Sequence, residues 1–299
     1  MSAVTCVLHH HIGPESAFER GLGISSTRER YDAQIRRLAL DYDVIDLETL
    51  LSGNLPRRAL LLTFDDAFRS VLDAARDTLA PLGLPSVFFV NPGLLGEDRV
   101  SLDSALAWAV DRAGLERVCE AAGVRRCETL AALVTGEMAT LGAGERLAIK
   151  ARVLEAFGPP DLAARAAVLR EEDIAAFRDL RVEIGNHTMT HVHCRSLTKE
   201  ECAEEIVGAK ERLEALSGAR VRAFSVPYGH ERDLTSETLA LLRASGHEAI
   251  FLVHARSNDR RPAPDVWYRT SLHDETPDQL RWHLRWKPAL RTLKRRLPV

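Results

Sequence analysis

Two histidines four residues apart are the first feature of this sequence that could do chemistry. His187 and His191 lie in the stretch EIGNHTMTH, directly after a short apolar run. Two neutral imidazoles and one carboxylate form a common catalytic zinc site, in which a fourth position stays open for water. If the chain after Asn186 turned into a helix, the i, i+4 spacing would place both rings on one face. Histidines at this spacing also occur by chance, so a metal site requires a third ligand elsewhere.

Two adjacent carboxylates, Asp65 and Asp66, follow the apolar stretch ALLLTF at residues 59–64. Successive side chains leave a strand in different directions, so the two carboxylates need not do the same task. One can bind a cation while the other contacts water, and a cation would relieve their repulsion in a site of low dielectric. Either aspartate could instead cap the helix that follows, because Asp is a favoured N-cap residue.

A third polar cluster lies in the stretch FSVPYGHE at residues 224–231, where an apolar strand runs into Pro227, Tyr228 and Gly229. Proline fixes the backbone and glycine permits an unusual turn, an arrangement that suits a backbone N–H held toward a ligand. A plain β-turn is equally compatible with Pro-Tyr-Gly.

The elements that position these clusters alternate along the chain. Strands are expected at residues 4–8, 59–64, 86–90, 182–185, 222–226, 249–253 and 267–272, with a short strand or turn at residues 44–47. Helices are expected at residues 28–40, 68–79, 196–216 and 236–244. Each polar cluster stands at the end of a strand. This pattern predicts a parallel α/β barrel, whose active site lies at the carboxyl ends of its strands.

Residues 91–180 interrupt the alternation and are rich in Ala, Leu, Glu and Arg. We interpret this segment as a helical insertion in a single domain that spans residues 1–299. The insertion could form a lid over the site, lined by Trp108 and nearby apolar residues. A helical addition with a small core of its own is the alternative.

The composition and charge of the chain limit the classes of protein to which it can belong. The chain has 299 residues, of which 45% are hydrophobic and 28% charged, and its net charge is −3. This balance gives no general attraction to nucleic acid or to an anionic membrane. Five cysteines without CxxC spacing indicate reduced thiols. The first residues lack the basic segment of a signal peptide, and no apolar run is long enough to span a membrane. We therefore expect a cytoplasmic protein.

The segment at residues 280–299 is basic, with seven Lys or Arg between Arg281 and Arg296 and no acidic residue. Trp282 and Trp286 lie one helical turn apart. Such a segment could contact an anionic membrane surface peripherally, at the inner membrane face. It could equally be a last helix that packs on the barrel, because this tryptophan spacing is ordinary for a buried helix face.

The three motifs together, in the order LTFDDAF, EIGNHTMTH and FSVPYG, resemble the polysaccharide deacetylase family, also known as the NodB homology domain or carbohydrate esterase family 4. The resemblance covers most of the chain apart from the insertion and the basic tail. It implies a distorted (β/α) barrel and a metal-dependent deacetylase that acts on N-acetylated sugars.

The resemblance also implies roles for single residues. Asp65 matches the general base of the family, and Asp66, His187 and His191 match its metal ligands. Tyr228, which follows Pro227, matches the residue whose backbone N–H helps to hold the oxyanion. Zinc is the expected metal, with Co²⁺ or Mn²⁺ as alternatives.

This sequence departs from the family pattern in three places. Ser225 stands where many members have an arginine that orients the base, and Arg269 near the last strand is a candidate for that task. Ala67 stands where glycine is usual. The late Leu-x-His motif that supplies the general acid has no clean match: we prefer His273, with His254 and His10 as alternatives.

These observations predict a hydrolase that removes an acetyl or similar acyl group from an N-acylated sugar, with a cytosolic or lipid-linked glycan precursor as substrate. One alternative is a deformylase or an amidase for a C–N bond outside sugars. The other is a carbohydrate-binding relative that keeps the motifs without catalysis.

Overall fold

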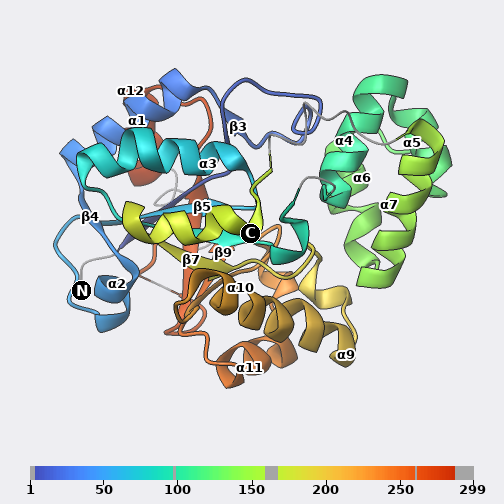
Figure 1. Ribbon diagram of the computed structural model, residues 1–299. Coiled ribbons are helices and arrows are strands. Elements are labelled where there is room, and N and C mark those ends of the chain that lie inside the picture. The colour runs from blue at the N-terminus through green and yellow to red at the C-terminus, as the bar shows by residue number, and fades with distance from the viewer. Residues whose placement is uncertain (1–3, 97–98, 159–167, 260, 287–299) are drawn as a thin grey trace, which may run out of the picture.

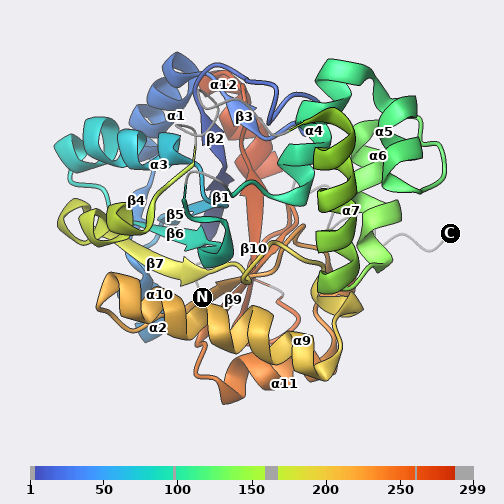
Figure 2. The same ribbon diagram turned by 45° about the vertical axis from the view of Figure 1, so that its right-hand side comes forward.

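A parallel β-sheet that closes on itself forms the centre of the protein (Figures 1 and 2). The computed structural model describes residues 4–96, 99–158, 168–259 and 261–286. The ring runs through β1 (Thr5–His9), β10 (Val266–Ser271), β9 (Ala249–Val253), β8 (Ala223–Ser225), β7 (Val182–Asn186), β6 (Ser86–Val90) and β5 (Ala59–Asp65), and β1 pairs with β5 to close it. Each of these pairings is parallel. The predicted α/β barrel is confirmed.

Strand β5 shows why the barrel forms. All seven of its residues are buried, as a strand covered on both faces requires. Its second half pairs with β6, where Asp65 lies opposite Phe89, and β6 in turn sets Val90 opposite Asn186 of β7. A short strand, β4 (Asp43–Ile45), pairs with its first half. These registers bring the residues after β5 and β7 to the same end of the barrel.

Helices surround the ring where amphipathic patterns were expected. They comprise α1 (Arg28–Asp41), α2 (Leu47–Ser52), α3 (Arg69–Ala74) with a π-helical turn η1 (Ala75–Leu79), α9 (Lys199–Cys202) with η7 (Ala203–Gly208) and α10 (Ala209–Ser217), and α11 (Ser236–Ala244). The helical segment predicted at residues 196–216 begins with Thr198 as its N-cap. The Thr198 hydroxyl accepts from the Glu201 backbone, and the Glu201 carboxylate accepts from the Thr198 backbone.

The insertion forms a separate group of helices to one side of the barrel, as Figure 2 shows. Of the predicted insertion at residues 91–180, the 3₁₀ segment η5 (Glu171–Leu180) packs on the barrel instead, where Ile174 and Phe177 belong to the main core. The group at the side consists of α4 (Leu102–Ala113), α5 (Leu115–Ala122), α6 (Leu130–Thr135) and α7 (Ala143–Phe157), with the 3₁₀ segment η4 (Glu137–Thr140). A hydrophobic cluster of its own holds these helices together, and Trp108 packs inside it with Val118, Leu133 and Val153. Trp108 therefore belongs to the core of the insertion and is not among the described residues that line the cavity described below.

Two short strands, β2 (His11–Ile12) and β3 (Ser25–Ser26), pair beside the barrel. They fix the two ends of a loop at residues 13–24. Phe18 of this loop is buried and packs with the insertion, so the loop bridges the barrel and the insertion.

The last described helical segments are α12 (Pro277–Arg281) and η9 (Trp282–Trp286). Leu280 and Leu284 are buried in the main core, while the side chain of Trp282 is exposed. Most of the basic tail, residues 287–299, lies outside the described residues. Within the described part of the chain, no helix combines the length and the apolar character needed to cross a bilayer.

Candidate active site

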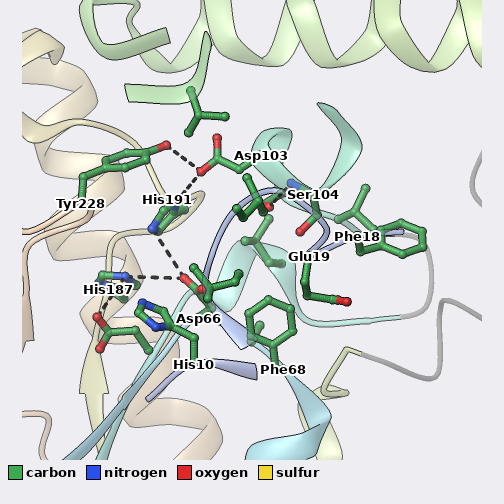
Figure 3. Close-up of a pocket in the computed structure, with 18 of the residues that line it drawn as sticks. His10, Phe18, Glu19, Asp66, Phe68, Asp103, Ser104, His187, His191 and Tyr228 are labelled. Carbon is green, nitrogen blue, oxygen red and sulfur yellow. Dashed lines mark hydrogen bonds and ion pairs between the residues drawn. The ribbon is translucent and has the colours of Figure 1, made fainter. Parts of the chain in front are cut away.

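Three polar side chains from two strand ends meet at the carboxyl end of the barrel (Figure 3). The Asp66 carboxylate lies 3.7 Å from His187 Nε2 and 3.5 Å from His191 Nε2. One ligand atom from each of the three residues lies within 4.8 Å of the others. A tetrahedral zinc with bonds of about 2.0–2.1 Å needs ligand atoms roughly 3.3 Å apart, so only small movements would be required.

The backbone around this cluster is unusual. Asp66, Thr188, His191 and Tyr228 have φ values of 76°, 66°, 62° and 61°, in the left-handed region that side chains other than glycine rarely adopt. The prediction of a helix after Asn186 is wrong, because residues 187–193 form an irregular loop. The left-handed residues of this loop turn both imidazoles toward Asp66. Strained backbone of this kind persists where surrounding contacts enforce it, and it concentrates at functional sites.

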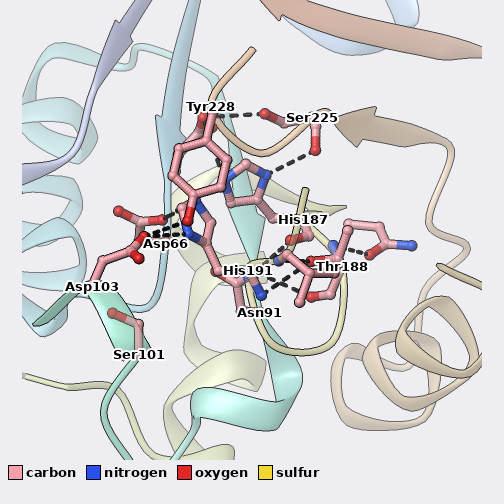
Figure 4. Close-up of polar contacts among 12 residues, drawn as sticks. Asp66, Asn91, Ser101, Asp103, His187, Thr188, His191, Ser225 and Tyr228 are labelled. Atoms are coloured by element: carbon pink, nitrogen blue, oxygen red, sulfur yellow. Dashed lines mark hydrogen bonds and ion pairs between the residues drawn. The ribbon is translucent and has the colours of Figure 1, made fainter. Parts of the chain in front are cut away.

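Each histidine is oriented by a second contact through its other ring nitrogen (Figure 4). His187 Nδ1 lies 2.8 Å from the Ser225 carbonyl oxygen, and His191 Nδ1 lies 3.0 Å from Asp103 Oδ2. Both acceptors favour the tautomer with the proton on Nδ1, which leaves the Nε2 lone pairs directed at Asp66. Metal-binding histidines are usually held in this way.

The charges around the cluster also fit a cation. The Asp65 carboxylate pairs with Arg269, and the Asp103 carboxylate pairs with Arg146. Among the residues that the structure describes, the ion-pair contacts of Asp66 are to the two histidines and to no Lys or Arg. One partly buried carboxylate and two imidazoles are the donor set of a three-ligand divalent metal site.

The titration of these groups follows from their surroundings. Burial lowers the pKa of His187 to about 3, so its ring is neutral and able to coordinate at neutral pH. Burial raises the pKa of Asp66 to about 6, and the nearby carboxylates of Asp65 and Asp103 add to this while His191 opposes it. In the metal-free protein, a proton and a metal therefore compete for Asp66.

This competition predicts a pH dependence of metal binding. Above about pH 6, Asp66 of the metal-free protein is ionised. Burial lowers the pKa of His191, but Asp66 and Asp103 outweigh it and raise that pKa above its usual value, so zinc reaches full affinity only once His191 has also lost its proton. Below about pH 6, the affinity should fall by at least tenfold per pH unit, roughly, because each bound metal must displace the proton. Zinc titration of the metal-free protein between pH 5 and pH 7.5 measures this. A constant affinity over that range would show that Asp66 is not a ligand.

Asp65 lies behind the cluster and is fixed from two sides. Arg269 donates to both carboxylate oxygens, at 2.6 Å and 2.7 Å, and Ser225 Oγ donates to Oδ2 at 3.1 Å. Burial raises the pKa of the Asp65 carboxyl, but Arg269 and His187 outweigh it and hold the pKa well below its usual range. The prediction that Arg269 could reach Asp65 is confirmed. Arg269 thus approaches the carboxylate from β10, at the point where Ser225 leaves space.

The turn at Pro227 places Tyr228 against the histidines. Gly229 has a φ of 69°, and a Cβ there would lie 2.4 Å from the Val253 backbone nitrogen, so this turn requires glycine. The Tyr228 ring stacks on His193 with centroids 3.6 Å apart. Within the described residues, the backbone N–H of Tyr228 donates no hydrogen bond. It is therefore available to an oxygen of a bound molecule.

Two buried residues of the insertion, Asp103 and Arg146, complete the site, and neither was predicted from the sequence. Asp103 Oδ2 accepts from His191 Nδ1 and, at 2.7 Å, from the Tyr228 hydroxyl. Arg146 Nη2 donates to Asp103 Oδ1 at 3.2 Å and to the Tyr228 hydroxyl at 2.8 Å. An acidic residue in the first turn of a helix is common because the helix dipole favours it. The sequence around Asp103 therefore does not indicate a role in the site.

The three histidines considered as general acid lie in different places. His10 lines the cavity together with Asp65, Asp66 and His187, and Figure 3 shows its ring beside Asp66. Among the described residues that line this cavity, neither His273 nor His254 is found. The Nδ1 atom of His273 is buried without a hydrogen-bond partner in the described residues. The ring of His254 instead packs against Tyr268, with centroids 5.9 Å apart.

A parallel barrel with such a cluster at the carboxyl ends of its strands defines an α/β-barrel enzyme. The chain belongs to the polysaccharide deacetylase family, whose family model matches residues 52–250. Members of this family are hydrolases that act on N-acetyl amide bonds. No curated protein sequence shows a significant match to the chain.

Solved structures share the fold at low sequence identity. The Streptococcus pyogenes deacetylase PplD, in complex with acetate, is 13% identical with a TM-score of 0.63, over 94% of this chain and 98% of that one. IcaB from Ammonifex degensii is 18% identical with a TM-score of 0.59, over 95% and 98%. The polysaccharide deacetylase BC0361 from Bacillus cereus is 15% identical with a TM-score of 0.61, over 95% and 69%. At these low sequence identities, the structural similarity establishes that the chain shares the fold of these proteins.

Proposed function

We propose that the protein is a metal-dependent hydrolase that removes an acyl group from the amide nitrogen of an N-acylated sugar. The observation that supports this best is the convergence of Asp66, His187 and His191 beside a carboxylate, Asp65, that Arg269 holds ionised. A divalent metal held by those three residues would polarise the amide carbonyl and lower the pKa of the attacking water. Zinc is the first candidate for this donor set, with Co²⁺ and Mn²⁺ as alternatives.

Residues of the chain would accept the proton of the attacking water and stabilise the oxyanion. Asp65 accepts the proton of the attacking water, because it is ionised, buried and 3.7 Å from His187. Arg269 and Ser225 keep its two oxygens in place. The backbone N–H of Tyr228, positioned by the turn at Pro227, donates to the oxyanion that develops on the carbonyl oxygen.

Two histidines, His273 and His10, are the candidates for the general acid. The sequence favours His273, which follows the last strand, whereas the cavity favours His10, which lines it. Burial lowers the pKa of His10 to about 4, so its ring is neutral at rest and must gain its proton during the reaction.

We expect His10→Asn to lower kcat by about 10²- to 10⁴-fold, the usual contribution of a general acid, and His273→Asn to lower it less. The measurement compares kcat and zinc affinity for both variants, since an acid should change kcat alone. If His273→Asn gave the larger loss of kcat at unchanged zinc affinity, the role would return to His273.

The proposed function is tested by acetate release from N-acetylated sugar nucleotides and chitooligosaccharides, with added Zn²⁺, Co²⁺ or Mn²⁺ and a chelator control. Release that stops with chelator and in the Asp65→Asn variant supports it. Release of formate or turnover of non-sugar amides alone would favour a deformylase or an amidase. Tight sugar binding without turnover, unaltered in Asp65→Asn, would favour a carbohydrate-binding protein.

We also propose a cytoplasmic location and a glycan precursor as substrate. The support is chemical: the five cysteines are free thiols, and Cys6, Cys119 and Cys194 are buried. Free thiols suit a reducing compartment. Fractionation of cells that produce the protein tests this, and recovery from the medium would contradict it.

Peripheral contact of the basic tail with an anionic membrane stays a prediction. Leu280 and Leu284 are buried in the main core, whereas the Trp282 side chain between them is exposed. Co-sedimentation with anionic vesicles should fall for a chain that ends at Trp286. Equal sedimentation of both chains would contradict the membrane role.

A further inference from the structure

A cavity of about 220 Å³ extends from the catalytic cluster into the space between the barrel, the loop at 13–24 and the insertion (Figure 3). Its wall away from Asp66 is largely apolar. The side chains that form it come from the loop, from the end of β5 and from the insertion: Phe18, Leu22, Phe68, Leu94, Val100 and Val134. An acetyl methyl group would leave most of this volume unused, since it equals that of roughly seven liquid waters at 30 Å³ each.

The polar groups of this wall are mostly engaged within the protein. Ser101 Oγ accepts from the Ser104 backbone at the start of α4, and Thr135 Oγ1 donates to the Ala131 carbonyl in α6. Glu19 is fully buried, and its Oε2 accepts from Ser16 while its Oε1 has no partner in the described residues. Outside the catalytic cluster, the polar groups left for a ligand are one buried oxygen of Glu19, the Ser104 hydroxyl and the part of the Arg99 guanidinium that does not donate to the Gly93 carbonyl.

This distribution decides which part of an N-acylated sugar enters the cavity. A sugar ring carries several hydroxyl groups, and each one buried without a hydrogen-bond partner costs free energy. The few polar groups of this wall cannot satisfy all of them. An alkyl chain has no such groups, and it gains affinity by displacing water that apolar walls hold poorly.

We infer that the cavity binds the acyl group of the substrate, and that this group is an alkyl chain of several carbons rather than acetyl. The inference rests on the proposed function and specifies its substrate class. The sugar then stays at the open side of the catalytic cluster, where its hydroxyl groups keep contact with water. Glu19 accepts a hydrogen bond from any hydroxyl group carried on the acyl chain.

The test compares glucosamine N-acylated with acetyl, butanoyl, hexanoyl and octanoyl groups. The ratio kcat/KM should rise about fourfold for each methylene added up to hexanoyl, because a buried methylene contributes about 0.8 kcal/mol. The same compounds, titrated into the metal-free protein, should bind more tightly with increasing length and with a negative heat-capacity change. The binding measurement does not depend on turnover.

Two neighbouring positions on α6 provide a matched pair of variants. Ala131 and Ala132 are both exposed, but only Ala131 lines the cavity. Ala131→Phe should abolish the preference for hexanoyl over acetyl. Ala132→Phe, with the same added bulk on the same helix, should behave like the unmodified protein.

The possible failures are distinguishable. Turnover of the acetyl compound that decreases with chain length, with no gain in binding, would overturn this inference and leave the proposed function intact. An unchanged length preference in Ala131→Phe would also overturn it. Absence of turnover for every compound would contradict the proposed function, and absence of length-dependent binding would then separately contradict the inference.

Discussion

The Asp65→Asn variant is expected to lose about 10²- to 10⁴-fold in kcat, the contribution typical of a general base, while it still binds zinc. Asparagine keeps the shape of aspartate but cannot accept the proton of water. The change also leaves the buried Arg269 guanidinium without its anionic partner, since both side chains are almost fully buried. Loss of one partner of a buried ion pair costs about 3–5 kcal/mol, so the free energy of unfolding should fall as well.

A second variant separates these two effects. The double change Asp65→Asn with Arg269→Met removes both charges, so the free energy of unfolding should recover while kcat stays low. Activity assays, zinc titration and thermal unfolding of the single and double variants provide the comparison. Recovery of turnover together with stability would mean that Asp65 acts through folding alone and is not the base.

The Asp103→Asn variant is expected to bind zinc about 10- to 100-fold more weakly, because the carboxylates that orient metal-binding histidines contribute that much to affinity. Asp103 reaches His191 Nδ1 from the insertion, although it would not itself touch the metal. Asparagine can present its NH₂ group to that nitrogen and so favour the wrong tautomer of His191. Competition against a chromogenic chelator measures the affinity directly, without a substrate.

Tyr228→Phe is the matched control for this prediction. It removes the hydroxyl group that donates to Asp103 but leaves the contact between Asp103 and His191 in place. Its zinc affinity should stay close to that of the unmodified protein. If Asp103→Asn kept full zinc affinity, or if both variants weakened it equally, Asp103 would serve only to attach the insertion.

The barrel could be predicted from the sequence because its strands carry a simple signal. The stretch ALLLTF is continuously apolar, and its residues are buried on both faces in β5. Predicted strand ends differ from the observed ones by one or two residues, since hydrogen bonding to neighbours decides them. The spacing of His187 and His191 was harder to interpret. It fits a helical face and also a loop with left-handed residues, and only the loop is observed.

The convergence of the candidate site residues could be predicted where they follow strands, but not where they come from the insertion. Asp65, Asp66, His187 and Tyr228 stand next to strands whose register brings them together. Asp103 and Arg146 are 43 residues apart in the chain, and their contact depends on how α4 and α7 pack. Local patterns do not encode such packing, so each of the two residues resembled an ordinary polar residue of a surface helix.

The contact between Asp103 and His191 is one of several that join the insertion to the barrel, since Phe18 and Tyr228 also pack against the hydrophobic core of the insertion. Thermodynamic reciprocity then applies: whatever the docked insertion adds to metal affinity, a bound metal must add to the docking of the insertion. Hydrogen exchange in α4 and α7 would slow on metal binding. A metal centre buried in the barrel would in this way govern how often the wall of the substrate cavity opens.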